Sequence, residues 1–140
     1  MRLQIISILL FFVLLVPVAH SDDDLYGTWG PSEYIVNGKL TPLRGIMIIT
    51  PDYFVGNTIF DADGDGEPDA NANSGPIVVV NGTIKLQQWM QLHWRSNGEG
   101  HFLKEDVPED IKYTIEENRL IFHFPSGNKY ISERLSGIDK

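Results

Sequence analysis

The stretch Ile77-Val-Val-Val-Asn-Gly-Thr-Ile-Lys-Leu-Gln-Gln-Trp-Met-Gln-Leu-His-Trp-Arg95 contains two largely apolar runs separated by Asn81-Gly82. Asn-Gly between apolar runs is the strongest short signal for a β-hairpin, because both residues accept the positive φ of a type I′ turn. The same pair recurs as Asn37-Gly38 and Asn97-Gly98. The sequence therefore predicts antiparallel strands that are joined by tight turns.

Short apolar or alternating segments, each ended by turn residues, continue along the rest of the chain. Eight or nine such strands, with turns about every 8–12 residues, indicate an all-β fold, either an antiparallel barrel or a sandwich. The expected segments are Leu25–Val36, Leu43–Thr50, Tyr53–Phe60, Ile77–Val80, Thr83–Arg95, His101–Lys104, Ile111–Ile115, Arg119–Phe124 and Lys129–Leu135.

The segment Thr83–Arg95 fits two templates. Helical spacing groups Leu86, Trp89, Met90, His93 and Trp94 on one face. Strict alternation, interrupted only at Gln88, instead groups Ile84, Leu86, Met90, Leu92 and Trp94. We favour a strand, because the segment lies between two Asn-Gly turns. If the interior of the fold holds a ligand, we expect Met90 and Trp94 to contact it.

Residues 1–21 are typical of a secretory signal peptide. A basic start, Met1-Arg2, precedes the apolar run Ile5–Val18, which is shorter than the ~20 residues of a membrane-spanning helix. Ala19 and Ser21 are small residues at the positions that a signal peptidase recognises. The alternative is an uncleaved membrane anchor. We expect cleavage before Asp22, a mature domain over residues 22–140, and a secreted or periplasmic location.

Composition excludes several classes of protein. The chain has 140 residues, no cysteine, and 19 acidic against 11 basic residues, for a formal net charge of −8. The mature length suits one domain with one core, and the lack of cysteine excludes a disulfide framework. Without a basic stripe, neither nucleic acid nor an anionic membrane surface is an expected partner.

Two short motifs carry a resemblance to a known family. Gly27-Thr-Trp29 follows directly after the predicted signal peptide, and Arg134 lies in the last expected strand. Together they resemble the lipocalin-like proteins, and the segment 113–122 resembles the penultimate hairpin of small bacterial members. The resemblance implies an antiparallel up-and-down β-barrel of about eight strands, closed at one end by Arg134 over Trp29. It also implies binding of a small hydrophobic molecule inside the barrel.

The residues leave two classes of function open. The first is a binding module that holds an apolar ligand; the second is a non-enzymatic structural or interaction protein whose barrel is filled by side chains. An enzyme is not expected, because the chain lacks the common nucleophile, phosphate-loop and zinc-protease motifs. His93 and His101 flank Asn97-Gly98, and together with His123 they form a hypothetical transition-metal site.

The acidic segment 61–73 (DADGDGEPDANAN) matches part of a calcium loop. Asp61, Asp63 and Asp65 stand at loop positions 1, 3 and 5, Gly66 at 6, and Asp69 at 9, while Glu67 at 7 would offer its backbone carbonyl. The run resembles the calcium loops of thrombospondin type 3 repeats and EF-hands, but position 12 is Ala72. Asn71 or Asn73 would have to supply the missing oxygen. The alternative is a solvated acidic loop without an ion.

Overall fold

The computed structural model describes residues 21–61, 63–87, 89–105 and 110–136. Within these ranges the regular elements are one short 3-10 helix, η1 (Asp22–Leu25), and β-strands. The strands are β1 (Gly27–Val36), β2 (Lys39–Pro42), β3 (Arg44–Ile49), β4 (Tyr53–Phe60), β5 (Asp69–Val80), β6 (Thr83–Leu86), β7 (Trp89–Trp94), β8 (Gly100–Glu105), β9 (Asp110–Glu116), β10 (Arg119–His123) and β11 (Lys129–Arg134). The predicted all-β class is confirmed. The apolar run of the predicted signal peptide lies outside the described residues.

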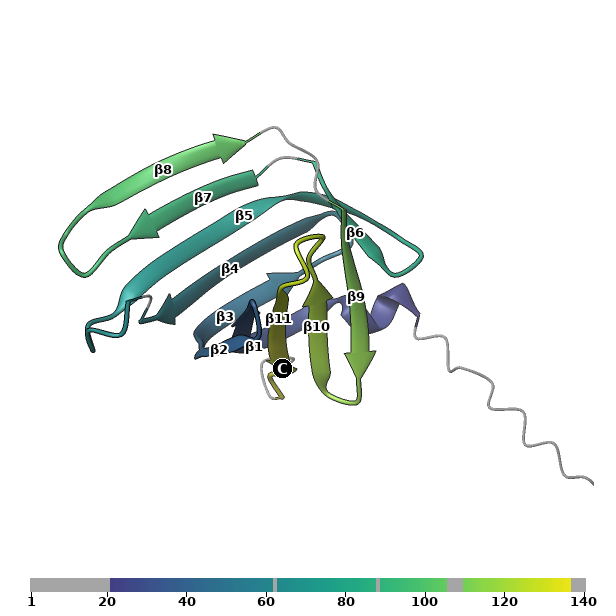
Figure 1. Ribbon diagram of the computed structural model, residues 1–140. Coiled ribbons are helices and arrows are strands. Elements are labelled where there is room, and N and C mark those ends of the chain that lie inside the picture. Colours follow the sequence, from purple (N-terminus) through teal and green to yellow (C-terminus); the bar gives the residue numbers. More distant parts are fainter. Residues whose placement is uncertain (1–20, 62, 88, 106–109, 137–140) are drawn as a thin grey trace, which may run out of the picture.

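Eight of these strands close into a barrel. Their order is β4-β3-β1-β11-β10-β9-β6-β5, and β5 pairs again with β4. Every pairing is antiparallel, so the predicted antiparallel barrel of about eight strands is confirmed. Two insertions decorate it: β2 folds back on β1, and the β7–β8 hairpin pairs with β5 and extends the sheet beyond the ring (Figure 1).

Two of the three Asn-Gly pairs form the expected turns. Asn37 and Gly38, and likewise Asn81 and Gly82, all have positive φ angles between 49° and 78°. They connect β1 to β2 and β5 to β6 by two-residue loops, as a type I′ turn does. The third pair lies in a longer turn between β7 and β8, where the Arg95 N–H donates to the Glu99 carbonyl at 2.8 Å.

The described residues of the segment 83–95 form strands β6 and β7 and no helix, as we favoured, but between Leu86 and Met90 the chain contains one residue more than β5 needs. Ile77 pairs with Leu86, and Ser74 pairs with Met90, so three steps along β5 match four steps along β6 and β7. An extra residue of this kind, as in a β-bulge, reverses which side chains face inward beyond it. The predicted single apolar face is therefore wrong after Leu86.

β5 is much longer than the expected strand Ile77–Val80. It begins at Asp69, and its first half pairs with β4 on one side and with β7 on the other. The added segment, Asp-Ala-Asn-Ala-Asn-Ser-Gly-Pro, is poor in residues that favour strands. Pairing along both edges outweighs this local preference, which is why the sequence pattern alone missed it.

The end of the barrel next to η1 is closed by packed side chains. Leu25, Trp29 and Leu120 have no exposed surface, and the indole Nε1–H of Trp29 donates to the Leu25 carbonyl at 2.9 Å. The guanidinium of Arg134 lies over the Trp29 ring. The predicted stacking of this pair is therefore confirmed.

Candidate functional site

Beyond the closed end, the barrel interior contains a cavity of about 870 Å³. It reaches from the core outward to the β1–β2 and β10–β11 turns, where the exposed residues Asn37, Lys39 and Ser126 form part of its wall. The deep wall is apolar. It includes Met47, Ile49, Phe54, Ile84, Leu86 and Phe122.

One side of the cavity is polar. Thr58 on β4 pairs with Asn71 on β5, which pairs in turn with His93 on β7. Two residues further along β5, Asn73 pairs with Gln91. All five residues line the cavity, because alternation along each strand points them inward.

Tyr130 connects this polar side to the aromatic wall. Its hydroxyl lies 3.4 Å from the Thr58 Oγ1, and its ring lies 6.0 Å from that of Tyr34 and 6.2 Å from that of Phe122, measured between centroids. Burial raises the pKa of the Tyr130 phenol above its ordinary value. The hydroxyl is thus kept protonated, able both to donate and to accept a hydrogen bond at the cavity wall.

His93 and His101 face each other across β7 and β8, with ring centroids 5.0 Å apart. Burial lowers the pKa of His93, and the neighbouring His101 and Arg95 lower it further. His123 does not join them. It lies on β10, where its Nε2 is 3.0 Å from Thr114 Oγ1 on β9, so the hypothetical three-histidine metal site is wrong.

Met90 and Trp94 are not among the residues that line the cavity. Trp94 is 53% exposed and lies on the outer face, as do Leu92 and Phe102, which are paired on β7 and β8. The extra residue before β7 turns Gln91 and His93 inward in their place. Sequence alternation alone could not locate these two, although the interruption at Gln88 marked where the pattern changes.

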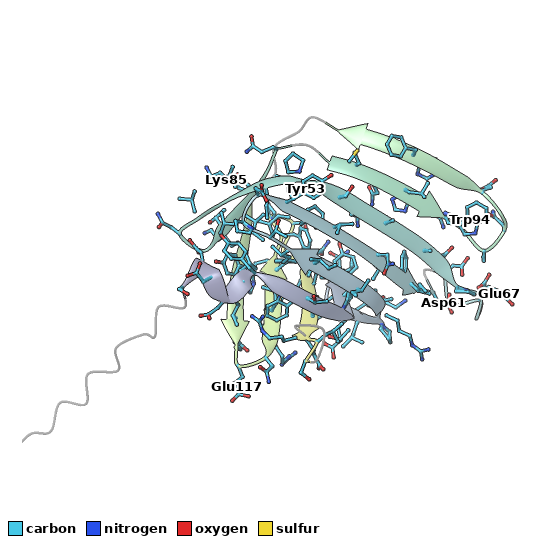
Figure 2. All side chains as sticks on the ribbon, turned by 180° about the vertical axis from the view of Figure 1, so that it is seen from behind. Tyr53, Asp61, Glu67, Lys85, Trp94 and Glu117 are labelled. Atoms are coloured by element: carbon cyan, nitrogen blue, oxygen red, sulfur yellow. The ribbon has the colours of Figure 1, made fainter. Side chains whose placement is uncertain are left out.

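The acidic loop between β4 and β5 gathers three carboxylates. Oxygens of Asp61, Asp63 and Asp65 lie within 4.8 Å of one another, and all three residues are exposed. The Asp61 carboxylate accepts hydrogen bonds from the Gly66 N–H at 2.9 Å and the Gly64 N–H at 2.7 Å. These bonds lower the pKa of Asp61. Figure 2 shows Asp61 and Glu67 at the same end of the molecule as Trp94.

The remaining predicted loop ligands are arranged differently. The Glu67 N–H donates to Asp65 Oδ1 at 2.7 Å, so its backbone takes part in the loop. Asp69 is 5% exposed, and its Oδ1 accepts a hydrogen bond from the Ser96 N–H at 3.2 Å, in the β7–β8 turn. Asn71 and Asn73 line the cavity, so they do not supply the oxygen that Ala72 lacks.

Comparison with known proteins adds no relative: no family model, curated protein or solved structure matches the chain. The described residues include no helix with the length and apolarity to span a bilayer. The assignment of function therefore depends on the barrel, its cavity and the acidic loop.

Proposed function

We propose that this chain is an exported, lipocalin-like binding protein that holds a small hydrophobic molecule inside its barrel. The observation that carries the proposal is the cavity of about 870 Å³ with its apolar deep wall. Sites for small molecules in proteins are typically about 300–1,000 Å³ and mostly apolar. The volume lies within that range.

The competing function, a filled barrel that serves only as a structural or interaction protein, fits less well. At the closed end, side chains such as Leu25, Trp29 and Leu120 have no exposed surface. Toward the open end, Gly56 of β4 pairs with Met47 of β3, and both line the cavity. Because glycine has no side chain, space is left there that a larger residue would fill. A barrel that evolved only as a scaffold gains stability by filling such space.

The second part of the proposal concerns the acidic loop, which we expect to bind calcium. Three carboxylates within 4.8 Å of one another repel unless a cation lies among them, and hard oxygen ligands suit Ca²⁺. The cation would order the connection between β4 and β5 and take no part in chemistry.

Binding of Nile red, an apolar dye whose fluorescence rises on leaving water, tests the cavity. We expect saturable binding with micromolar affinity. In Gly56→Leu the new side chain would enter the cavity, because a Cβ at Gly56 would meet Met47 only at ordinary contact distance, 3.4 Å. We expect this variant to fold and to lose the dye.

Val55→Leu is the matched control, since Val55 precedes Gly56 and is 47% exposed on the outer face. It should bind Nile red like the unmodified protein. Equal binding by Gly56→Leu would place the dye elsewhere and contradict the proposal. Native mass spectrometry of protein purified from its own source would then show whether a small molecule accompanies it.

A further inference from the structure

The inward face of the β5–β7 pair changes character along the barrel. Near the closed end its residues are apolar, with Ile77 of β5 paired to Leu86 of β6. Four residues from Ile77 along β5, Asn73 faces inward beside Gln91, and two residues further Asn71 faces inward beside His93. Four residues of extended strand span about 13 Å. The cavity wall therefore changes from apolar at Leu86, the partner of Ile77, to polar at Asn73 over about that distance.

The polar cluster is only partly satisfied by the protein. Gln91 Nε2 donates to Asn71 Oδ1 at 3.3 Å. Asn73 Oδ1 is shielded from solvent, yet it accepts no hydrogen bond within the described part of the chain. An enclosed amide without a partner costs free energy, and a second molecule that donates to it removes that cost. Because the amide can rotate, Asn73 can offer either its oxygen or its NH₂ group.

The charged residues that line the cavity restrict which polar group a bound ligand could carry. Although the chain carries 19 acidic residues, no described aspartate or glutamate lines the cavity. Its ionisable side chains with basic character are Lys39 at the rim and His93 within the polar cluster. A cationic group would find no carboxylate partner there, whereas a hydroxyl, an amide or a carboxylate would find donors.

We propose that the cavity takes an amphipathic molecule with an alkyl-like body and an uncharged or anionic hydrogen-bonding head, the head lying on Asn73, Gln91 and His93. The body would lie against Ile84 and Leu86. This inference rests on the proposed function and deepens it, because it assigns the chemical class of the ligand and the residues that select it.

Displacement of Nile red by four probes with the same alkyl chain tests the proposal: dodecane, dodecanol, dodecanoate and dodecyltrimethylammonium. We expect dodecanol to compete about 10-fold more strongly than dodecane, the factor for one well-made neutral hydrogen bond in an enclosed site. Dodecanoate should likewise compete more strongly than dodecyltrimethylammonium.

Asn73→Leu keeps the approximate size of the side chain and removes its polar atoms. We expect it to lose the preference for dodecanol over dodecane, measured as the ratio of the two displacement constants within the variant. Ser74→Ala is the control, because Ser74 is the next residue of β5 and pairs with Met90 on the other face. It should retain the preference. Gln91→Met is a second variant of the same kind, should Asn73→Leu fail to fold.

The outcomes separate this inference from the proposed function. If Nile red does not bind at all, both fail. If the dye binds but all four probes displace it equally, the polar head site is overturned while a hydrophobic cavity stands. A preference for dodecanol that survives in both Asn73→Leu and Gln91→Met would equally overturn the assignment to these residues.

Discussion

The guanidinium of Arg134 lies over the indole of Trp29, with its Cζ 4.2 Å from the ring centroid. The two residues are directly opposite each other where β1 pairs with β11. Arg134 also donates through Nη1 to the Tyr26 carbonyl at 3.3 Å and through Nη2 to the Asp24 carbonyl. One side chain thus joins the last strand to both the first strand and η1, at the closed end of the barrel.

Removing either member of this pair should destabilise the barrel, and the two effects should be coupled. Trp29→Ala should lower the free energy of unfolding by about 3–5 kcal/mol, as large core truncations do. Arg134→Ala should cost less, and the pair should show a coupling of roughly 0.5–2 kcal/mol. Urea denaturation of both single variants and the double variant measures this. Strict additivity would contradict a role for the stacked pair in closing the barrel.

Substitution of Gly27 should also destabilise the protein, because Gly27 lies against the Arg134 side chain. Its φ is +135°, and a Cβ at this position would lie 3.0 Å from Arg134 Nη1. Gly27→Ala should therefore lower the free energy of unfolding by about 1–3 kcal/mol. Part of that cost comes from the contact with Arg134, so it should shrink in the Arg134→Ala background. An unchanged cost there would show that backbone strain alone is responsible.

Stability should decline in mildly acidic solution because of His93. Its pKa in the folded protein is below its ordinary value of 6.5, so the unfolded chain binds a proton more readily. The free energy of unfolding is then unaffected well above pH 6.5, falls as the pH drops below that value, and levels off below the folded pKa. His93→Gln should remove this part of the decline. Denaturant titrations of the unmodified protein and of His93→Gln between neutral and acidic pH, made without calcium, would measure the difference. Identical pH profiles of stability for the two proteins would refute the prediction.

Calcium should bind weakly, with a dissociation constant on the order of 10⁻⁴–10⁻³ M, because a strong ligand is absent at the last loop position. At about 1 mM calcium and a dissociation constant of about 0.1 mM, the free energy of unfolding should rise by roughly 1.4 kcal/mol. Calorimetric titration and melting curves with and without calcium measure both quantities.

The double variant Asp63→Ala plus Asp65→Ala should abolish both calcium effects, because it removes two of the three clustered carboxylates. Glu116→Gln, which changes one acidic residue on β9, should abolish neither. A protein that gives no heat and no change in melting temperature with calcium has only a solvated acidic loop at this position.

Processing of the chain should leave Asp22 as its first residue. Asp22 is the first residue of η1, and its Oδ1 accepts a hydrogen bond from the Tyr113 hydroxyl at 2.6 Å, so its side chain already takes part in the fold. N-terminal sequencing of exported protein should yield Asp-Asp-Asp-Leu. A protein recovered with Met1 in place would overturn the signal-peptide prediction.

The features that sequence reasoning located correctly depend on local chemistry. Asn37-Gly38 and Asn81-Gly82 mark turns because few other residues adopt positive φ at low cost. Trp29 and Arg134 are the exception, because they are far apart in the chain and only the resemblance to lipocalin-like proteins predicted that they would meet. The carboxylates of Asp61, Asp63 and Asp65 are close in space largely because they are close in the chain.

The features that it missed depend on partners distant in sequence. The first half of β5 forms a strand because β4 and β7 pair with its two edges, and its own residues give little sign of this. The inward position of Gln91 and His93 follows from one extra residue relative to β5, whose effect appears only once both strands are aligned. Alternation therefore predicted the strand correctly and its inner face incorrectly.

That extra residue between Leu86 and Met90 makes the chemistry of the cavity a matter of strand register as much as of composition. If β7 slipped by one residue against β5, so that Trp89 and not Met90 paired with Ser74, the alternation of β6 would continue unbroken; Leu92 and Trp94 would then face into the barrel and Gln91 and His93 out of it. No side chain would need to be replaced. A change of strand register alone can thus convert a polar binding wall into an apolar one.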